Sequence, residues 1–287
     1  MAKLLKGIDT ALKIREGVLS GSKQLQSKGI TPTLAIIRAG KKGDDISYER
    51  SIIKCCEKVE VNVAHFVLPE SISTEELLDT VNKVNNDKAI HGVLIMRPLP
   101  SQVDDGQVRA SLSPEKDIDG ITNGSLAGVI TSEKQGFAPC TAQACMEILE
   151  HNGIPLEGKN VVVVGRSLVV GKPLAMMLLQ KNATVTVCHS KTADLPSVCR
   201  EAKVLFVAIG RAEMINSAYL SQGQTVIDVG IHVKEDGSLC GDVKFDEAEP
   251  VVEAITPVPG GVGTVTSSVL VKNVVEAANR QTWTRTD

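Results

Sequence analysis

Residues 158–173 read GKNVVVVGRSLVVGKP, and this stretch determines the class of the fold. Val161–Val164 is a short, continuous apolar run, which is typical of a central strand in a parallel sheet covered by helices on both faces. Gly165, Ser167 and Gly171 then form a turn that leads into a helix pattern. Strand, glycine-containing turn and helix predict the phosphate-binding corner of a dinucleotide-binding domain, although serine replaces the second glycine of the usual G-x-G-x-x-G pattern.

Helix-like and strand-like segments alternate along the rest of the chain. We expect helices at residues 8–28, 46–59, 73–84 and 173–180, and strands at 33–37, 61–68, 91–96, 183–188, 204–209 and 225–229. Gly29 is suited to cap the first of these helices, and Ser73 with Glu76 provides the side chains of a capping box. Alternation of the two patterns predicts a layered α/β architecture.

The composition excludes several classes of protein. The 287 residues carry 31 Lys+Arg against 34 Asp+Glu, a net charge of −3, which gives no support to nucleic-acid or membrane-surface binding. Only four Phe, two Tyr and one Trp occur, so we expect a core of Val, Ile, Leu, Ala and Met. No apolar run approaches the roughly 20 residues that span a bilayer.

The cysteines and the N-terminus indicate the compartment. Seven cysteines occur, an odd number with no C-x-x-C pair, which predicts reduced thiols and no zinc or other metal site. The charged N-terminus lacks the apolar segment of a signal peptide. We therefore expect a cytoplasmic protein, and its length allows one large domain or two ordinary ones.

The second strand of the dinucleotide pattern indicates which cofactor binds. NAD-preferring sites usually place Asp or Glu at its end, where the acid binds the ribose hydroxyls. Here the strand ends at Cys188, and no acid follows before Asp194. Arg166 and Ser190 are instead suited to a 2′-phosphate, with Lys191 adding positive potential, so NADP is favoured and NAD stays the alternative. The simpler interpretation is that Ser190 starts a turn and Arg166 is solvated.

Five segments carry a resemblance that covers nearly the whole chain. They are PEKDIDG at 114–120, PCT at 139–141, the GRS…VGKP turn at 165–173, NATVTVCHS at 182–190 and ITPVPGGVG at 255–263. The last is the most specific, because two prolines and three glycines in nine residues are hard to explain by generic packing. With these segments the chain closely resembles the methylenetetrahydrofolate dehydrogenase/cyclohydrolase family.

The resemblance implies a homodimer of two-domain chains. An N-terminal α/β catalytic domain at residues 1–139 would bind the folate, and a Rossmann-like NAD(P)-binding domain with a parallel sheet would follow at 140–287. A C-terminal helix at about 266–280 would pack back on the first domain, and the folate cleft would lie between the two. The implied reaction oxidises 5,10-methylenetetrahydrofolate by hydride transfer to the nicotinamide, a step of one-carbon metabolism. Most relatives then hydrolyse the 5,10-methenyl product to 10-formyltetrahydrofolate.

Site residues follow from the resemblance one position at a time. Tyr48 matches the family tyrosine that lies against the folate ring, although a lone tyrosine is also commonly a half-buried packing residue. Asp119 matches the acid that pairs with the pterin. Further substrate contacts are expected from Met96, Arg97 and the closing loop of Pro259, Gly260, Gly261, Val262 and Gly263. Cofactor contacts are expected from Gly165, Arg166, Ser167, Ser190 and Ile231.

Two positions depart from the family pattern. The family places a lysine four residues after the tyrosine, as the acid/base group of the hydrolase step, and this chain has Ile52 there. Lys54 is no substitute, because on a helix it lies about 120° from Tyr48, whereas position i+4 lies about 40° away. Met96 stands where relatives usually have a glutamine that hydrogen-bonds the lysine. Both partners are thus replaced by apolar side chains, which is close to neutral for stability.

Both departures bear on one of the two reactions. Hydride transfer depends mainly on positioning and does not strictly require the lysine. Hydrolysis needs proton transfers, which a positioned base accelerates by roughly 10²–10⁴-fold, and neither Ile52 nor Met96 can move a proton. Arg97 is a poor proton shuttle because arginine has a high pKa. We therefore expect a dehydrogenase whose cyclohydrolase activity is absent or weak.

Three alternatives stay open. The first is an ordinary bifunctional dehydrogenase/cyclohydrolase in which another group performs the hydrolysis. The second is a non-catalytic folate- or NADP-binding protein, against which the retained Tyr48, Asp119 and glycine-rich segments argue. The third is a Rossmann dehydrogenase for another small molecule, which the specific motif at 255–263 disfavours.

Overall fold

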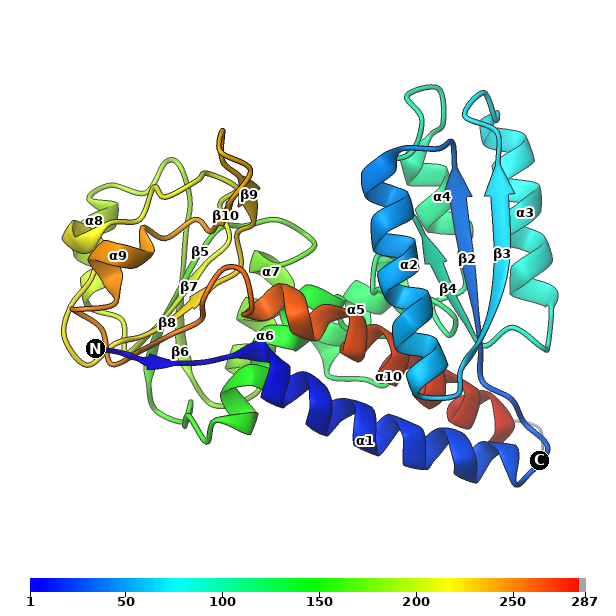
Figure 1. The fold of residues 1–287 in the computed structure, drawn as a ribbon, viewed down its shortest axis with the longest axis horizontal. Coiled ribbons are helices and arrows are strands. Elements are labelled where there is room, and N and C mark those ends of the chain that lie inside the picture. Colours follow the sequence, from blue (N-terminus) through cyan, green and yellow to red (C-terminus); the bar gives the residue numbers. More distant parts are fainter. Residues whose placement is uncertain (284–287) are drawn as a thin grey trace. The chain divides into compact units, whose positions relative to one another are not determined.

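The chain forms two compact units, each with its own parallel sheet. Figure 1 shows the computed structural model, which describes residues 1–283. Unit 1 consists of Met1–Leu12 and Thr141–Thr266, and unit 2 consists of Lys13–Cys140 with the segment from Ser267 onward. Helices and strands alternate in both, so the predicted α/β fold class is confirmed.

Unit 1 is built on a six-stranded parallel sheet with the order β1-β11-β8-β7-β5-β6. The strands are β1 (Lys3–Leu4), β5 (Asn160–Val164), β6 (Thr184–Cys188), β7 (Val204–Val207), β8 (Thr225–Asp228) and β11 (Ala254–Ile255). The helices are α6 (Cys140–His151), α7 (Gly171–Leu179), α8 (Leu195–Arg200), α9 (Phe245–Ala248) and the 3-10 helix η1 (Ser217–Tyr219). A small antiparallel ladder joins β9 (His232–Val233) to β10 (Leu239–Cys240).

β5 lies between β7 and β6, and its four valines are all buried, as expected for an inner strand of a parallel sheet. Val162 is aligned with Thr186 of β6 on one side and with Leu205 of β7 on the other. The surrounding core consists mainly of valine, leucine, isoleucine and alanine, and Phe206 is a fully buried ring within the sheet. The predicted aliphatic core is confirmed.

The first residues of the chain group with unit 1. β1 pairs in parallel with β11, with Lys3 opposite Ala254. The amide of Gly7 donates to the carbonyl of Gly260 at 2.7 Å, and α1 (Gly7–Gln26) runs on from there into unit 2. Residues 1–12 thus belong to unit 1, whereas the sequence predicts one continuous domain at 1–139. The sequence does not reveal this grouping, because a two-residue strand leaves no periodic signal.

Unit 2 is built on a three-stranded parallel sheet with the order β3-β2-β4. The strands are β2 (Thr33–Ala39), β3 (Asn62–Leu68) and β4 (Gly92–Ile95), and the helices are α2 (Gly43–Lys58), α3 (Thr74–Asn86), α4 (Asp105–Ser111), α5 (Asn123–Thr131) and, from Ser267, α10 (Val262–Trp283). The capping box of α3 is confirmed: the amide of Glu76 donates to Ser73 Oγ at 3.2 Å, and the amide of Ser73 donates to the Glu76 carboxylate at 2.9 Å.

The expected helices and strands are present, with shifts of a few residues at their ends. The elements that the sequence patterns missed are mostly short, such as α4, α8 and the β9–β10 ladder. Within residues 1–283, no helix has the length and apolar character that crossing a membrane requires.

Candidate functional site

α2 presents Tyr48 and Ile52 one helical turn apart in unit 2. Ile52 is completely buried, whereas Tyr48 exposes 41% of its surface. Lys54 lies on an exposed part of the same helix, in line with the helical spacing. The position four residues after the tyrosine is therefore apolar and closed to water.

Met96 and Arg97 follow β4 in the same unit. The amide of Met96 donates to the carbonyl of Ile37 at 2.8 Å, which extends the pairing of β4 with β2, and Met96 is only 5% exposed. Arg97 pairs through Nη1 with Asp105. Its buried Nε and Nη2 atoms have no hydrogen-bond partner among the described residues. Burial, and then the neighbouring Arg109, lowers the pKa of the Arg97 guanidinium.

Asp117 and Asp119 form the acidic part of this region. The buried Asp117 carboxylate accepts hydrogen bonds from the amides of Ile121 and Thr122 and from Ser125 Oγ, at 3.0, 2.7 and 2.6 Å. Burial, followed by the charge of Asp117, raises the pKa of Asp119 to about 7. Asp119 therefore exchanges its proton near neutral pH.

Tyr48, Asp119 and Cys140 lie close enough to influence one another electrostatically. Burial raises the pKa of Tyr48, and the charges of Asp119 and Cys140 raise it further. Burial and Asp119 hold the pKa of the Cys140 thiol well above its usual value, so the thiol is neutral. Cys140 Sγ donates to the carbonyl of Ile118 at 3.2 Å and accepts from the Asn273 amide group at 3.7 Å. Unit 2 thus brings two predicted site residues, the tyrosine and the acid, into one cluster.

Unit 1 contains a cavity of about 350 Å³ where β5 and β6 end. The turn after β5 brings Gly165, Arg166 and Ser167 to its wall, and the residues after β6 contribute Ser190. The amide of Gly165 donates to the carbonyl of Cys188 at 2.9 Å, which joins the two strand ends. Four of the five predicted cofactor residues therefore line one cavity.

The glycines of this turn are needed for space. Gly165 has a φ of +127°, and a Cβ there would lie 2.2 Å from the carbonyl oxygen of Ala208. A Cβ on Gly171 would lie 2.1 Å from the carbonyl oxygen of Gly165. Ser167 Oγ accepts from the amide of Val170 at 3.1 Å, which leaves the hydroxyl hydrogen available to a ligand. A bare backbone turn before a helix N-terminus fits the phosphates of a dinucleotide.

Ile231, the fifth predicted cofactor residue, does not line this cavity. It lies just before β9 and is 62% exposed. The loop after β7 instead contributes Ile209 and Arg211 to the wall. Sequence reasoning missed Arg211, although a basic residue shortly after a buried strand of a dinucleotide-binding pattern is a usable signal.

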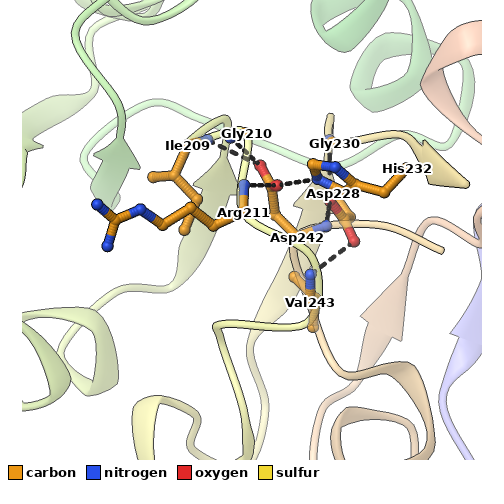
Figure 2. A network of polar contacts seen from close by, with 8 residues as sticks. All are labelled: Ile209, Gly210, Arg211, Asp228, Gly230, His232, Asp242 and Val243. Carbon is orange, nitrogen blue, oxygen red and sulfur yellow. Dashed lines mark hydrogen bonds and ion pairs between the residues drawn. The ribbon is translucent and has the colours of Figure 1, made fainter. Parts of the chain in front are cut away.

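The buried carboxylate of Asp242 holds the loop that carries Arg211 (Figure 2). It accepts hydrogen bonds from the amides of Ile209, Gly210 and Arg211, at 2.7, 3.1 and 2.8 Å. His232 Nε2 donates to the same carboxylate at 2.8 Å. One side chain therefore connects the loop after β7 with β9.

Asp228, at the end of β8, holds the backbone of Asp242 in place. Its carboxylate accepts from the amides of Gly230, Asp242 and Val243, at 3.0, 3.0 and 2.9 Å. Burial raises the pKa of Asp228 to about 7, although these three amides oppose the shift. The network was missed because its donors are backbone amides from separate loops, which carry no sequence signal.

The glycine-rich segment 257–263 belongs to unit 1 and leads into α10. Gly260 has a φ of +102°, and a Cβ on Gly261 would lie 2.5 Å from the carbonyl oxygen of Pro257. Gly263 has open space around it, so packing does not demand a glycine there. Tyr48, Met96, Arg97 and Asp119 belong to unit 2 and this loop to unit 1; its closing over a substrate stays a prediction.

All seven cysteines are buried and free of disulfides. Among the described residues, no group of three or more His, Cys, Asp or Glu side chains is placed to hold a metal ion.

Two family models match the chain in tandem. Residues 5–119 match the catalytic domain of tetrahydrofolate dehydrogenase/cyclohydrolase, and residues 139–282 match its NAD(P)-binding domain. The chain belongs to the tetrahydrofolate dehydrogenase/cyclohydrolase family. The predicted family resemblance is confirmed.

Relatives of this family match almost end to end. The bifunctional protein FolD of Clostridium botulinum (strain Langeland) is 47% identical over 280 residues, which cover 98% of this chain and 99% of the relative. The bifunctional FolD methylenetetrahydrofolate dehydrogenase/cyclohydrolase of Campylobacter jejuni superposes with a TM-score of 0.95, at 38% identity and 98% and 99% coverage. The Trypanosoma brucei FolD, solved with NADP cofactor and an inhibitor, has a TM-score of 0.91, 33% identity and 98% coverage of both chains.

Two of the expected site residues of this chain lie close together, and two others are apolar. Tyr48 and Asp119 lie together with Cys140. The two positions that resemblance assigns to a lysine and a glutamine hold the buried, apolar Ile52 and Met96.

Proposed function

We propose that this protein oxidises 5,10-methylenetetrahydrofolate to 5,10-methenyltetrahydrofolate with hydride transfer to NADP, and that it hydrolyses the methenyl product weakly or not at all. Membership of the dehydrogenase/cyclohydrolase family supports the oxidation. The observation that carries the second half is the complete burial of an apolar Ile52 one turn after Tyr48.

The cavity in unit 1 supports the choice of a dinucleotide cofactor. Bound NADP would supply the hydride acceptor. Gly165 and Ser167 would hold its diphosphate on the turn after β5, and Arg166 with Ser190 would bind the 2′-phosphate. Both side chains line the same cavity, which favours NADP, and NAD is the alternative. Ile231, outside the cavity wall, stays an expected cofactor contact that rests on resemblance.

The folate would bind to the domain at residues 1–139. Tyr48 would stack on its ring, and Asp119 would pair with the pterin. Met96, Arg97 and the loop Pro259–Gly263 would complete the contacts. Since oxidation needs two carbons held at close approach, these residues act by positioning and by excluding water.

Hydrolysis makes a different demand, because water attack and collapse of the adduct both move protons. Ile52 and Met96 offer no group that gains or loses one. Both side chains are buried. Replacement of both members of a hydrogen-bonded pair also avoids an unsatisfied polar group, which supports an adapted site.

The ordinary bifunctional enzyme is the second candidate. The relatives named above are described as bifunctional. Asp119, with a pKa of about 7, is a group that could take over the proton transfer. A homodimer and a cytoplasmic location remain predictions from resemblance and from composition.

Separate assays of the two half-reactions test the proposal. Purified protein is incubated with methylenetetrahydrofolate and NADP or NAD, and reduced cofactor and methenyl product are followed independently. Methenyltetrahydrofolate is then supplied directly, and its decay is compared with decay in buffer alone. We expect oxidation at a substantial rate and decay close to the buffer value.

An engineered gain of function makes the test sharper. The double variant Ile52→Lys, Met96→Gln should accelerate methenyl decay by roughly 10²-fold or more. Ser51→Lys, on an exposed part of the same helix, is the matched control and should leave the decay unchanged. Decay by the unmodified protein at the rate of oxidation would establish the bifunctional alternative. Binding without reduction of either cofactor would establish a non-catalytic binding protein.

A further inference from the structure

The Asp242 carboxylate accepts as many hydrogen bonds as it can, all from the loop after β7 and from β9. Oδ2 accepts from the amides of Ile209 and Gly210, and Oδ1 accepts from the amide of Arg211 and from His232 Nε2. A carboxylate offers about four acceptor sites, so no site is left for solvent or for another side chain. Three successive amides on one carboxylate fix both the position and the direction of their loop.

The surroundings of this carboxylate allow little adjustment. A Cβ on Gly230 would lie 2.4 Å from Cγ of Asp242, and a Cβ on Gly241 would lie 1.9 Å from Oδ2 of Asp228. Asp228 in turn holds the amide of Asp242 at 3.0 Å. The loop after β7 is thus attached to a closely packed, buried side chain rather than to a mobile surface side chain.

Arg211 uses only its backbone in this network. Figure 2 shows its amide directed at Asp242, while its side chain extends away from the two carboxylates. That side chain lines the 350 Å³ cavity together with Arg166. Two guanidinium groups at one cavity match a ligand with several negative charges.

We propose that Asp242 is a positioning residue for the cofactor, which holds Arg211 where its guanidinium contacts a phosphate group of the dinucleotide. The proposal rests on the proposed function, since it takes the unit 1 cavity as the dinucleotide site. His232 takes part by donating to the carboxylate oxygen that also holds the Arg211 amide. Loss of the His232 hydrogen bond changes the orientation of the Asp242 carboxylate and weakens cofactor binding without touching the folate residues.

Binding of NADP and NAD to the full-length protein, measured by calorimetry, tests the proposal. Arg211→Gln should weaken NADP about tenfold, the loss expected for one charge-assisted contact. A larger effect on NADP than on NAD assigns the contact to the 2′-phosphate, and an equal effect assigns it to the diphosphate. Arg211 is exposed, so this variant should fold normally.

A matched pair of variants tests the positioning role. His232→Leu removes the donor and should weaken NADP roughly three- to tenfold, whereas His232→Gln keeps an N–H donor and should restore most of the affinity. The KM for NADP should rise in the leucine variant while kcat and the KM for the folate stay near their original values. Lys234→Gln is the control, because it breaks only the exposed Lys234–Glu213 pair between the same two segments and should change affinity less than twofold.

Two results would overturn the inference. One is Arg211→Gln binding both cofactors within twofold of the unmodified protein. The other is His232→Leu matching His232→Gln in affinity. Failure of the unmodified protein to bind either dinucleotide is a separate outcome, and it would refute the proposed function itself.

Discussion

Asp117 holds its carboxylate on three hydrogen-bond donors, and its charge contributes to raising the pKa of Asp119, two residues later, to about 7. Burial of Asp119 is the larger cause. The two carboxyl groups thus differ in environment although they share one short segment, and such a difference is how proteins assign different protonation states to neighbouring acids.

The first prediction concerns pH and stability. An Asp has a pKa of about 3.9 when unfolded, so between about pH 4 and pH 7 the folded Asp119 binds more protons than the unfolded one. Its contribution to stability therefore falls as pH rises through this window. Asp119→Asn removes the dependence, so its Tm relative to the unmodified protein should be higher at pH 8 than at pH 5.

Thermal unfolding followed by circular dichroism at both pH values provides the measurement. Asp104→Asn is the control, because hydrogen bonds from the side chain and the amide of Gln107 hold the pKa of Asp104 below its usual value, so the group is ionised at both pH values. Its Tm difference should be constant. An equal Tm difference for Asp119→Asn at pH 5 and pH 8 would contradict the raised pKa.

The second prediction concerns the buried Ile52. Ile52→Lys alone places an unpaired ammonium in a completely buried position and should destabilise the protein by about 2–5 kcal/mol. Adding Met96→Gln supplies a partner, so a double-mutant cycle should show about 0.5–3 kcal/mol of favourable coupling. Urea unfolding measures both values. Strict additivity of the two changes would mean that positions 52 and 96 do not form a pair.

Local features of the fold could be predicted from the sequence because short-range chemistry produces them. The turn from Gly165 to Gly171 needs glycines for close backbone approach, and that need is visible in one short segment. The capping box at Ser73 is equally local. By contrast, the β1–β11 pairing joins residues 3 and 254, which are far apart in the sequence, and no local pattern predicts a two-residue strand.

Some residues of the candidate site could likewise be predicted from local sequence, and others could not. Ile52 and Met96 could be assigned from spacing and resemblance, since helical geometry fixes where position i+4 lies. Asp242 could not be assigned, because its role depends on hydrogen bonds from the backbone amides of residues 209–211, which lie far from it in the sequence. The expected cofactor contact of Ile231 came from resemblance; Ile231 lies outside the wall of this cavity, and the contact stays a prediction.

The third prediction concerns the glycine turn. Gly165→Ala combines a φ of +127° with a Cβ 2.2 Å from a backbone oxygen, so it should cost more than 2 kcal/mol and abolish NADP binding. Gly158→Ala is the matched control, because its φ is +67° and nothing lies within 4 Å of the added Cβ. It should cost only about 1 kcal/mol and leave binding intact. Chemical denaturation and cofactor titration measure the two effects.

The fourth prediction concerns cofactor choice. Arg166→Gln with Ser190→Ala removes both expected partners of the 2′-phosphate, so the ratio of kcat/KM for NADP to that for NAD should fall about 10²-fold. Steady-state rates with each cofactor measure it. Lys181→Gln, exposed and outside the cavity wall, is the control and should leave the ratio unchanged. A ratio that survives the double change would place the 2′-phosphate elsewhere.

The last prediction concerns a buried ion pair beside Tyr48. Arg38 Nε lies 2.6 Å from the Glu49 carboxylate, and both residues are buried, so α2 is tied to β2 at the residue next to the tyrosine. Glu49→Leu leaves the arginine uncompensated and should cost about 3–5 kcal/mol, with a higher KM for the folate. The double variant Arg38→Met, Glu49→Leu removes both charges and should recover most of that stability, because a well-packed apolar pair avoids the desolvation penalty. The exposed Arg50→Met serves as the control, within about 0.5 kcal/mol of the unmodified protein. Denaturant unfolding of all four proteins decides the point: a single variant as stable as the double one would show that the ion pair does not anchor α2.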